Sequence, residues 1–318
     1  MGLLADRRGL VAGVAVAVAL VALLVATGED SALVIGATTG SAYGLVALGL
    51  VLVYKSSGVF NFAQGEFGTV ALYALYLLDF ETSYWLAFLG ALAAAVLMGF
   101  LTERVVVRPL FDAPRVTLLV ATAGVALLAI GIEIWFGSAQ GKPIAKGFDR
   151  VDRVELLGVQ ISDQRLWLIA TLAVLAVALG LFFTRTNLGL AIIGASQEPV
   201  ATELVGISVR RLSSFTWMLA ALLGGLAALI AVPDSGSFGP GIMTSTFLIP
   251  AFTAAVLGGM TSLPGAFVGG VIIGILESVA TSAPIFEDIP GTKSTLVVFV
   301  VLLAVLTIRP QGLFGTRA

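Results

Sequence analysis

Long apolar runs recur along this chain, and they restrict it to one broad class of fold. A helix needs roughly 20 consecutive apolar residues to cross a bilayer. Only 11% of the residues are charged, whereas soluble domains carry about 25%. The sequence therefore predicts an all-α, polytopic transmembrane helical bundle, a single domain over 1–318 with about eight to ten spans. The apolar runs lie at 9–27, 31–54, 63–79, 84–101, 116–136, 166–184, 214–232, 246–260, 265–280 and 294–308.

Three of these runs are short and interrupted by Gly or Pro, namely 63–79, 246–260 and 265–280. We expect half-helices or re-entrant segments there, with about eight full spans as the alternative to ten. Broken helices survive at membrane depth only where protein buries them or where they line a cavity. The bundle is therefore expected to contain discontinuous helices. The run at 9–27 ends in a poor signal-peptide cleavage site, which favours an uncleaved first helix.

Basic residues predict the orientation, because cytoplasmic loops carry an excess of Lys and Arg. Ten alternating spans would place eleven of the 17 Lys and Arg on one side, together with both termini. Acidic residues, including Asp234, lean towards the other side. We therefore expect cytoplasmic termini, an outer loop at 137–165 and a cytoplasmic loop at 185–213.

Both loops are long enough to form structure of their own. In the outer loop, residues 154–156 and 159–161 alternate apolar and polar side chains, which indicates a small β-hairpin. In the inner loop, a short helix is expected to start at Pro199 and to end before Gly206, with Ser196 or Glu198 as its cap.

The chain lacks cysteine and histidine, which excludes several kinds of chemistry. Without cysteine there is no disulfide and no thiolate metal site, and without histidine there is no Ser-His or Cys-His catalysis. Segment 137–143 resembles a phosphate-binding loop, but Pro143 stands where a Ser or Thr should bind magnesium. We therefore expect no cofactor and no metal in this chain, and any use of ATP must lie with a partner.

Asn61, Gln64 and Glu66 place polar groups where a span should be apolar, and they are candidates for a substrate path. An ionisable residue inside a membrane costs about 2.5–3.5 kcal/mol on insertion scales, so it usually marks a path or a buried pair. A second interpretation is structural. Asn61 fits a helix N-cap, and Glu66 would then complement the helix dipole in the first turn. Both interpretations can hold together.

Glu133 and Glu277 are the other two acids inside apolar runs, and they are further candidates for the path. Glu133 stands near the outer end of its run, so the alternative is that it snorkels to the membrane interface. Glu277 follows Gly270 and Gly274, whose spacing is typical of closely packed helices. For Glu277 an interhelical hydrogen bond is therefore favoured over a substrate contact.

The expected inner helix near 199–205 also has two interpretations. It is either an amphipathic connector or a coupling helix that docks in a groove of a cytosolic motor. The candidate coupling residues are Glu198, Ala201, Glu203, Leu204 and Gly206.

Four parts of the chain together resemble one known family, in order and with fitting spacing. The chain is similar, over nearly its whole length, to the branched-chain amino acid permeases of ATP-binding-cassette importers. The stretches that carry the resemblance are Gly49 to Tyr54 with Asn61 to Glu66, Thr186 to Leu190 with Ala201 to Ile207, Gly258 to Ala266, and Arg309 to Gly315.

The resemblance implies a permease subunit of an ATP-driven importer for branched-chain amino acids or related small polar solutes, rather than an enzyme. It implies the importer permease fold and a place in the bacterial plasma (inner) membrane. The implied partners are a second homologous permease subunit, two cytosolic ATPases and an external solute-binding protein, with no nucleic acid. The stretch 201–207 would contact the ATPase. Family members often carry histidine where Gln64 stands, so no proton-linked role is expected at that position.

Two other classes of function stay open at this point. An autonomous channel or ion-coupled carrier for urea or an amide would be favoured by a paired set of membrane charges, or by uptake without any ATPase. A membrane-embedded enzyme would need a site built on Asp or Glu, because His and Cys are absent.

Overall fold

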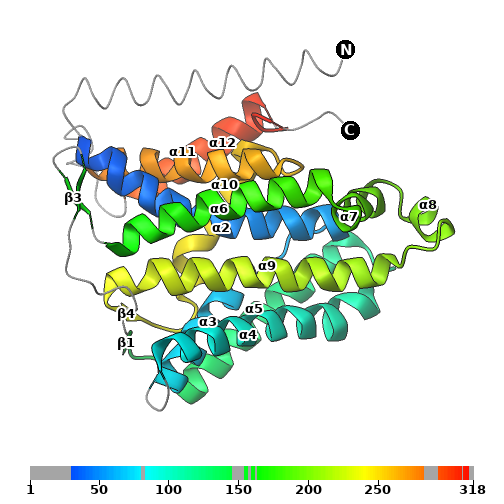
Figure 1. Cartoon of the computed structure of the whole chain (residues 1–318), viewed down its shortest axis with the longest axis horizontal. Helices are drawn as coiled ribbons and strands as arrows, with labels where there is room; N and C mark the ends of the chain where they lie inside the picture. The colour runs from blue at the N-terminus through cyan, green and yellow to red at the C-terminus, as the bar shows by residue number, and fades with distance from the viewer. Residues whose placement is uncertain are drawn as a thin grey trace.

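The computed structural model describes residues 30–79, 83–144, 154–156, 159–161, 163–282, 293–309 and 311–314. Within these residues the chain is almost entirely helical (Figure 1). The predicted span at 9–27 lies outside them. The α-helices are α2 Asp30–Ser57, α3 Gln64–Asp79, α4 Tyr84–Leu101, α5 Arg115–Gly137, α6 Asp163–Arg185, α7 Asn187–Gln197, α8 Pro199–Leu204, α9 Val209–Ala231, α10 Ile249–Gly258, α11 Leu263–Ser282 and α12 Lys293–Ile308.

Short helices of other types and four short strands complete the described chain. Two π-helices, η1 and η4, continue α4 and precede α10. The bounds are η1 Thr102–Val107, η2 Arg108–Leu110, η3 Val232–Ser235, η4 Met243–Leu248, β1 Lys142–Pro143, β2 Val154–Leu156, β3 Val159–Ile161 and β4 Ser237–Phe238.

Six described helices are long and apolar enough to cross a membrane, which confirms the polytopic class. Two shorter apolar helices, 243–258 and 293–307, accompany them. The prediction of a broken segment at 265–280 was wrong, because α11 runs without interruption over Leu263–Ser282. Its glycines serve close packing against α2 and do not break the helix.

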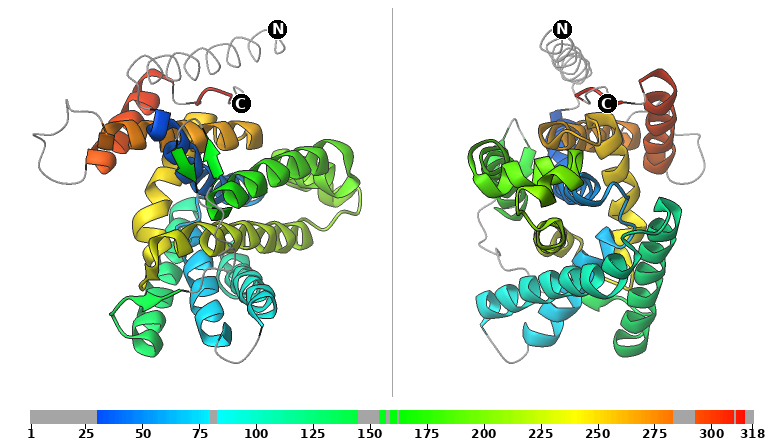
Figure 2. Two further views of the ribbon diagram at one scale, coloured as in Figure 1. Left: turned by 60° about the vertical axis from the view of Figure 1, so that its left-hand side comes forward. Right: turned by 90° about the vertical axis from the view of Figure 1, so that its right-hand side faces the viewer.

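Helix α2 forms the core of the bundle, as expected for a long helix that is apolar on every side. It packs against α11, α9, α10 and α6. On the other side of α9 lie α3 and α4, which also pack against each other. Figure 2 shows α9 between α2 and α4 in both views. Helices α2 and α9 therefore join the two halves of the molecule.

Glycines allow α2 and α11 to approach until their backbones touch. A Cβ atom added at Gly274 would collide with the backbone of Gly36 and Gly40, and one added at Gly270 would collide with Gly44. The small-xxx-small spacing of Gly270 and Gly274 is thus a packing device, as the sequence predicted.

The interruption before α3 is buried against α5. The amide of Phe62 donates a hydrogen bond of 3.2 Å to Thr122 Oγ1, two turns into α5. The amide of Ala63 donates to Asn61 Oδ1 at 3.0 Å, so Asn61 caps the start of α3 as predicted. The backbone groups freed by the interruption therefore find partners inside the protein.

The two predicted loops lie at opposite ends of the molecule (Figure 1). At one end, β2 and β3 form the predicted antiparallel hairpin, in which Val154 pairs with Ile161, and β1 pairs with β4. At the other end, α8 covers the short helix predicted between Pro199 and Gly206. The separation agrees with placing 137–165 and 185–213 on opposite faces of a membrane.

A buried ion pair between η1 and η2 bonds to α9 close to the end that carries α8. Arg108 binds the fully buried carboxylate of Glu103 at 3.1 Å, and the Ser214 hydroxyl donates to the same carboxylate at 2.6 Å. Arg108 also donates to the Arg210 carbonyl at 3.1 Å. The network holds the first turns of α9 against η1.

The glycine contact generates a test. Gly274→Ala should cost about 1–3 kcal/mol of stability, because the added Cβ must force two backbones apart. Gly124→Ala is the matched control, since nothing lies within 4 Å of that Cβ position; it should be neutral or gain up to about 1 kcal/mol in helix propensity. Thermal denaturation of the purified variants in detergent measures both. Equal midpoints would contradict the packing.

The buried ion pair generates a second test. Arg108→Ala should lower stability by about 3–5 kcal/mol, because it strands a buried carboxylate. Arg104→Ala, on the exposed side of the same turn, should have little effect. Adding Glu103→Gln to Arg108→Ala should restore much of the loss, since the stranded charge is then gone. Thermal denaturation in detergent measures the stability of all three variants. If the double variant were no more stable than Arg108→Ala, the loss would not come from the stranded charge.

Candidate functional site

Asn61 and Gln64 are buried and tie the start of α3 to α9. The Asn61 Nδ2 group donates to Gln64 Oε1 at 3.4 Å, and Gln64 Nε2 donates to the Ala220 carbonyl at 2.9 Å. Gly49 on α2 leaves room for the Gln64 amide, which a Cβ atom would displace. Both amides therefore have protein partners, and they anchor a discontinuous helix.

Glu66 lies in the first turn of α3 but does not cap it. Its side chain is fully buried, and neither carboxylate oxygen has a hydrogen-bond donor. It faces Glu133 of α5, whose Oε2 accepts from the Gly241 amide at 2.9 Å. The structure thus brings together two acids that lie 67 positions apart in the chain.

The expectation that Glu133 snorkels to the membrane interface was wrong, because only 4% of the residue is exposed. Its position on α5 explains the burial. The buried residues of this helix form one stripe at helical spacing, which faces the rest of the protein. In the sequence, mostly small or polar residues recur at every third or fourth position of this helix. That spacing is the signal that could have placed Glu133 on the buried side. The stripe is Leu118, Thr122, Ala126, Ala129, Glu133 and Gly137.

Glu277 stands apart from that pair and makes the interhelical hydrogen bond favoured from the sequence. The Tyr43 hydroxyl on α2 donates to Glu277 Oε2 on α11 at 2.6 Å. The Tyr43 ring also packs edge-on against Phe247, with the ring centroids 5.7 Å apart.

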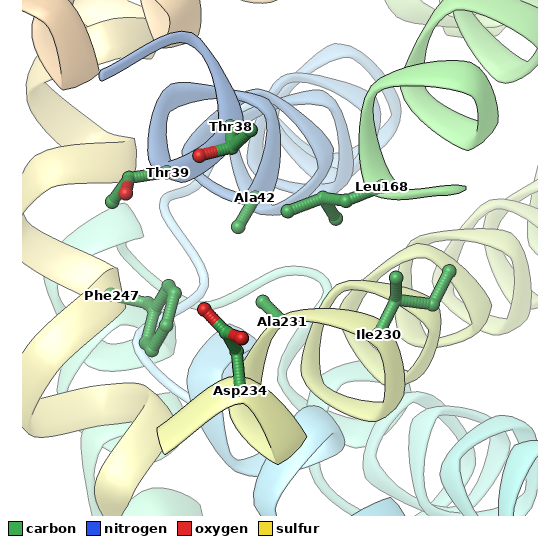
Figure 3. Close-up of a pocket in the computed structure, with 8 residues that line it drawn as sticks. All are labelled: Thr38, Thr39, Ala42, Leu168, Ile230, Ala231, Asp234 and Phe247. Atoms are coloured by element: carbon green, nitrogen blue, oxygen red, sulfur yellow. The ribbon is translucent and has the colours of Figure 1, made fainter. Parts of the chain in front are cut away.

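A cavity of about 80 Å³ lies between α2, α6, α9, η3 and η4. Figure 3 shows the Asp234 carboxylate turned into this space, with the Thr38 and Thr39 hydroxyls on its far side. Apolar side chains line the rest. The lining residues are Thr38, Thr39, Ala42, Leu168, Ile230, Ala231, Asp234 and Phe247.

None of the five acids and amides proposed for the path from the sequence lines this cavity. Sequence reasoning had counted Asp234 only among the acids of the outer side. The signal that could have singled it out is its place in η3, directly after the long apolar helix α9. Asp234 stands at the end of a span, and the chain turns sharply at Gly236, which has a left-handed backbone conformation. This turn keeps Asp234 next to the helices of the bundle.

Helix α8 presents the candidate coupling residues at the surface. Pro199 opens the helix at its first position. Gly206 ends it with φ of 84°, while the amides of Gly206 and Ile207 bond back to the carbonyls of Glu203 and Thr202. This is the left-handed glycine cap that needs no Cβ. Glu198 stands at the N-cap position without a side-chain capping bond.

The exposed side of α8 carries large apolar side chains, with Glu203 among them. Leu204 is 83% exposed, and Ala201, Glu203 and Gly206 are exposed beside it. Thr202 is buried on the inner side, where its hydroxyl bonds the Glu198 carbonyl at 2.9 Å. Ala201, Glu203 and Leu204 therefore lie on α8, and Glu198 and Gly206 flank it, at one accessible end of the molecule.

Helix α9 connects this exposed end to the cavity. It begins at Val209, directly after the α8 cap, and ends at Ala231, which lines the cavity together with Ile230. This continuous helix of 23 residues is about 35 Å long at 1.5 Å per residue. Within the described residues no cluster of acids could hold a metal ion.

The sequence of this chain is similar to those of known permeases. Residues 32–306 match the family model described as "Branched-chain amino acid transport system / permease component". The high-affinity branched-chain amino acid transport system permease protein BraD of Pseudomonas aeruginosa is 33% identical over 89% of this chain and 94% of its own length. The corresponding permease protein LivH of Escherichia coli is 29% identical over 88% and 93%.

A more distant relative belongs to a different transport system. The ribose import permease protein RbsC of Escherichia coli is 26% identical over 74% of this chain and 73% of its own length. The family match covers the described helices from α2 into α12. This chain therefore belongs to the family of branched-chain amino acid transport system permease components.

Proposed function

We propose that this permease moves branched-chain amino acids, or related small zwitterions, across the membrane. As a family member it is a transport subunit and not an enzyme, and no finding supports an autonomous channel or carrier. The relatives that align over most of both chains are amino-acid permeases, whereas the ribose permease aligns less fully. The chemistry of the cavity is the observation that supports an amino acid over a sugar as the solute.

The cavity wall carries one anionic group, Asp234, and the side chains of Thr38 and Thr39, and it is otherwise apolar. The Asp234 carboxylate can meet an ammonium group, and charge-assisted hydrogen bonds of this kind are the stronger ones. Ala42, Leu168, Ile230 and Phe247 can accept an aliphatic side chain. A sugar has no positive charge to pair with a carboxylate. The cavity is small, so passage of a solute requires α9 or η4 to move.

The proposed path continues from the cavity along the polar residues named from the sequence. Glu277 adjoins it through Tyr43 and Phe247. Asn61, Gln64 and Glu66 lie at the buried start of α3, where backbone dipoles can meet a zwitterion without a full side-chain charge, and Glu133 faces Glu66 from α5.

The proposed assembly contains a second homologous permease subunit, two cytosolic ATPases and an external solute-binding protein. ATP would act in those ATPases, with no cofactor in this chain. Both termini would be cytoplasmic, and the β1–β4 end would receive solute from outside. Exposed apolar side chains on α4, α5, α6 and α12 suit contact with lipid or with the second subunit.

The proposed mechanism runs through α8 and α9. An ATPase groove would hold the exposed apolar side of α8 as a helix in a groove. Movement of α8 would shift α9, and α9 carries part of the cavity wall at its far end. The cavity would in this way open to alternate sides of the membrane.

Leu204→Asp tests the docking helix. A charge on the exposed apolar side should abolish ATPase association while membrane insertion is retained, because Leu204 makes no buried contact in this chain. Co-purification of the ATPase with the tagged permease measures it. Ser237→Asp, exposed at the opposite end, is the control and should leave the complex intact. Survival of the complex in Leu204→Asp would move the docking site elsewhere.

Asp234→Asn tests the solute site. Loss of a charge-assisted hydrogen bond, about 1.5–3 kcal/mol, should reduce uptake of leucine by about tenfold or more at low solute concentration. Asp234→Glu should retain part of the activity. Uptake is measured in vesicles with the complete transporter and is normalised to the amount of permease in the membrane. Unchanged normalised uptake in Asp234→Asn would refute this site.

A further inference from the structure

Two buried carboxyl groups face each other in this protein without a cation between them. Glu66 is 0% exposed and Glu133 is 4% exposed. Both Glu66 oxygens and the Oε1 atom of Glu133 are buried and have no hydrogen-bond donor. The two side chains lie within hydrogen-bonding range of each other, and the Thr244 and Thr69 side chains also lie in range of Glu66. A Cβ atom added at Gly241 would lie 3.7 Å from Glu66 Oε1, so the Gly241 amide that donates to Glu133 is close to both acids.

Other acids of the bundle have donors, which makes this pair distinctive. Glu103 is as deeply buried as Glu66, but it binds Arg108 and the Ser214 hydroxyl. Glu277 accepts the hydroxyl proton of Tyr43. Within the described part of the chain, no Lys or Arg forms an ion pair with Glu66 or Glu133.

The groups around the pair are neutral oxygen atoms and one backbone amide. From α3, the Tyr73 hydroxyl is buried without a partner and lies beside Gly137, one turn beyond Glu133. Also from α3, Thr69 accepts from the Met243 amide at 3.4 Å. From η4, the Thr244 hydroxyl is buried beside Glu66.

Between the glutamate pair and the β1–β4 end of the molecule lies a group of aromatic side chains. Tyr73 and Tyr76 both pack on Phe238, and Lys142 lies over the outer ring of this group, 5.8 Å from the Tyr76 centroid. The titratable groups that face the pair are therefore the two glutamates themselves and Tyr73.

Two bare carboxylates in contact inside an apolar bundle would face both desolvation and mutual repulsion. One proton removes both problems and supplies the missing donor. We propose that Glu66 and Glu133 form a proton-binding site that holds one proton between them. Because the Gly241 amide donates to Glu133 Oε2, the shared proton lies between Glu66 and the unpartnered Oε1 atom of Glu133.

The shared proton would join three pieces of backbone that are not adjacent in sequence. Glu66 belongs to the first turn of α3, Glu133 to α5, and Gly241 to the turn that leads into η4. Both discontinuous segments of the bundle are thereby fastened to α5 by one hydrogen-bonded chain. This inference does not depend on the transported solute or on the proposed ATPase partners.

Infrared difference spectroscopy of the purified full-length chain at neutral pH tests the proposal. The wild type should show the carbonyl band of one buried, protonated carboxylic acid, which shifts on exchange into D₂O. Glu66→Gln should lose this band, because the introduced side-chain amide can donate to an ionised Glu133 without any extra proton. Glu133→Gln should shift the band, because the partner of the acid changes.

Glu103→Gln and Glu277→Gln are the matched controls, since both acids already have donors. Neither should affect the band. A wild-type spectrum without the band, or a band that survives unchanged in Glu66→Gln, would overturn the proposal. Since the Glu66→Gln substitution keeps a hydrogen-bond donor at this position, the variant should fold and remain measurable.

Sodium is the alternative occupant, because every unpartnered side-chain atom around the pair is an oxygen. Thermal denaturation in sodium chloride and in choline chloride separates the two. A proton site predicts the same midpoint in both salts for the wild type and for Glu66→Gln. A sodium-dependent rise in the wild-type midpoint that disappears in Glu66→Gln would refute the shared proton. Neither experiment uses transport, so its failure would leave the proposed function standing.

Discussion

Two interrupted stretches of backbone govern this bundle, because backbone groups freed inside a membrane must find partners within the protein. The chain before α3 bonds to Thr122, and the turn before η4 bonds to Glu133. Both partners belong to the same buried stripe of α5. Helix α5 is therefore the common support of the two discontinuous segments, although most of its remaining surface is exposed and apolar.

The packing of α2 and α9 matters for transport because these two helices form opposite walls of the cavity. Backbone contact through Gly40, Gly44, Gly270 and Gly274 holds α2 against α11, and close contact of this kind resists sliding. Helix α9 extends from the exposed end near α8 to the cavity. One wall of the cavity thus belongs to the packed α2 core, and the other belongs to a helix whose far end is accessible to a partner.

Local patterns were sufficient where neighbouring residues decide the structure. The hairpin at 154–161, the helix between Pro199 and Gly206 and the Asn61 cap all follow from turn and capping chemistry within a few residues. The pairing of Glu277 with another helix was also expected, but Tyr43 as its partner was not, because 234 positions separate the two residues. The coupling and path roles of the residues named from the sequence stay predictions.

By itself, the sequence determined the class of this protein, since apolar runs of bilayer length and scarce charge leave only a helical membrane bundle. It also determined which residues were too polar for their surroundings. Only the tertiary structure decided which of those residues meet. Burial of Glu133 beside Glu66, and the position of Asp234 on a cavity wall, depend on how α3, α5, α9 and η4 are turned towards one another. That rotation is set by side-chain packing between helices distant in sequence, which no local pattern encodes.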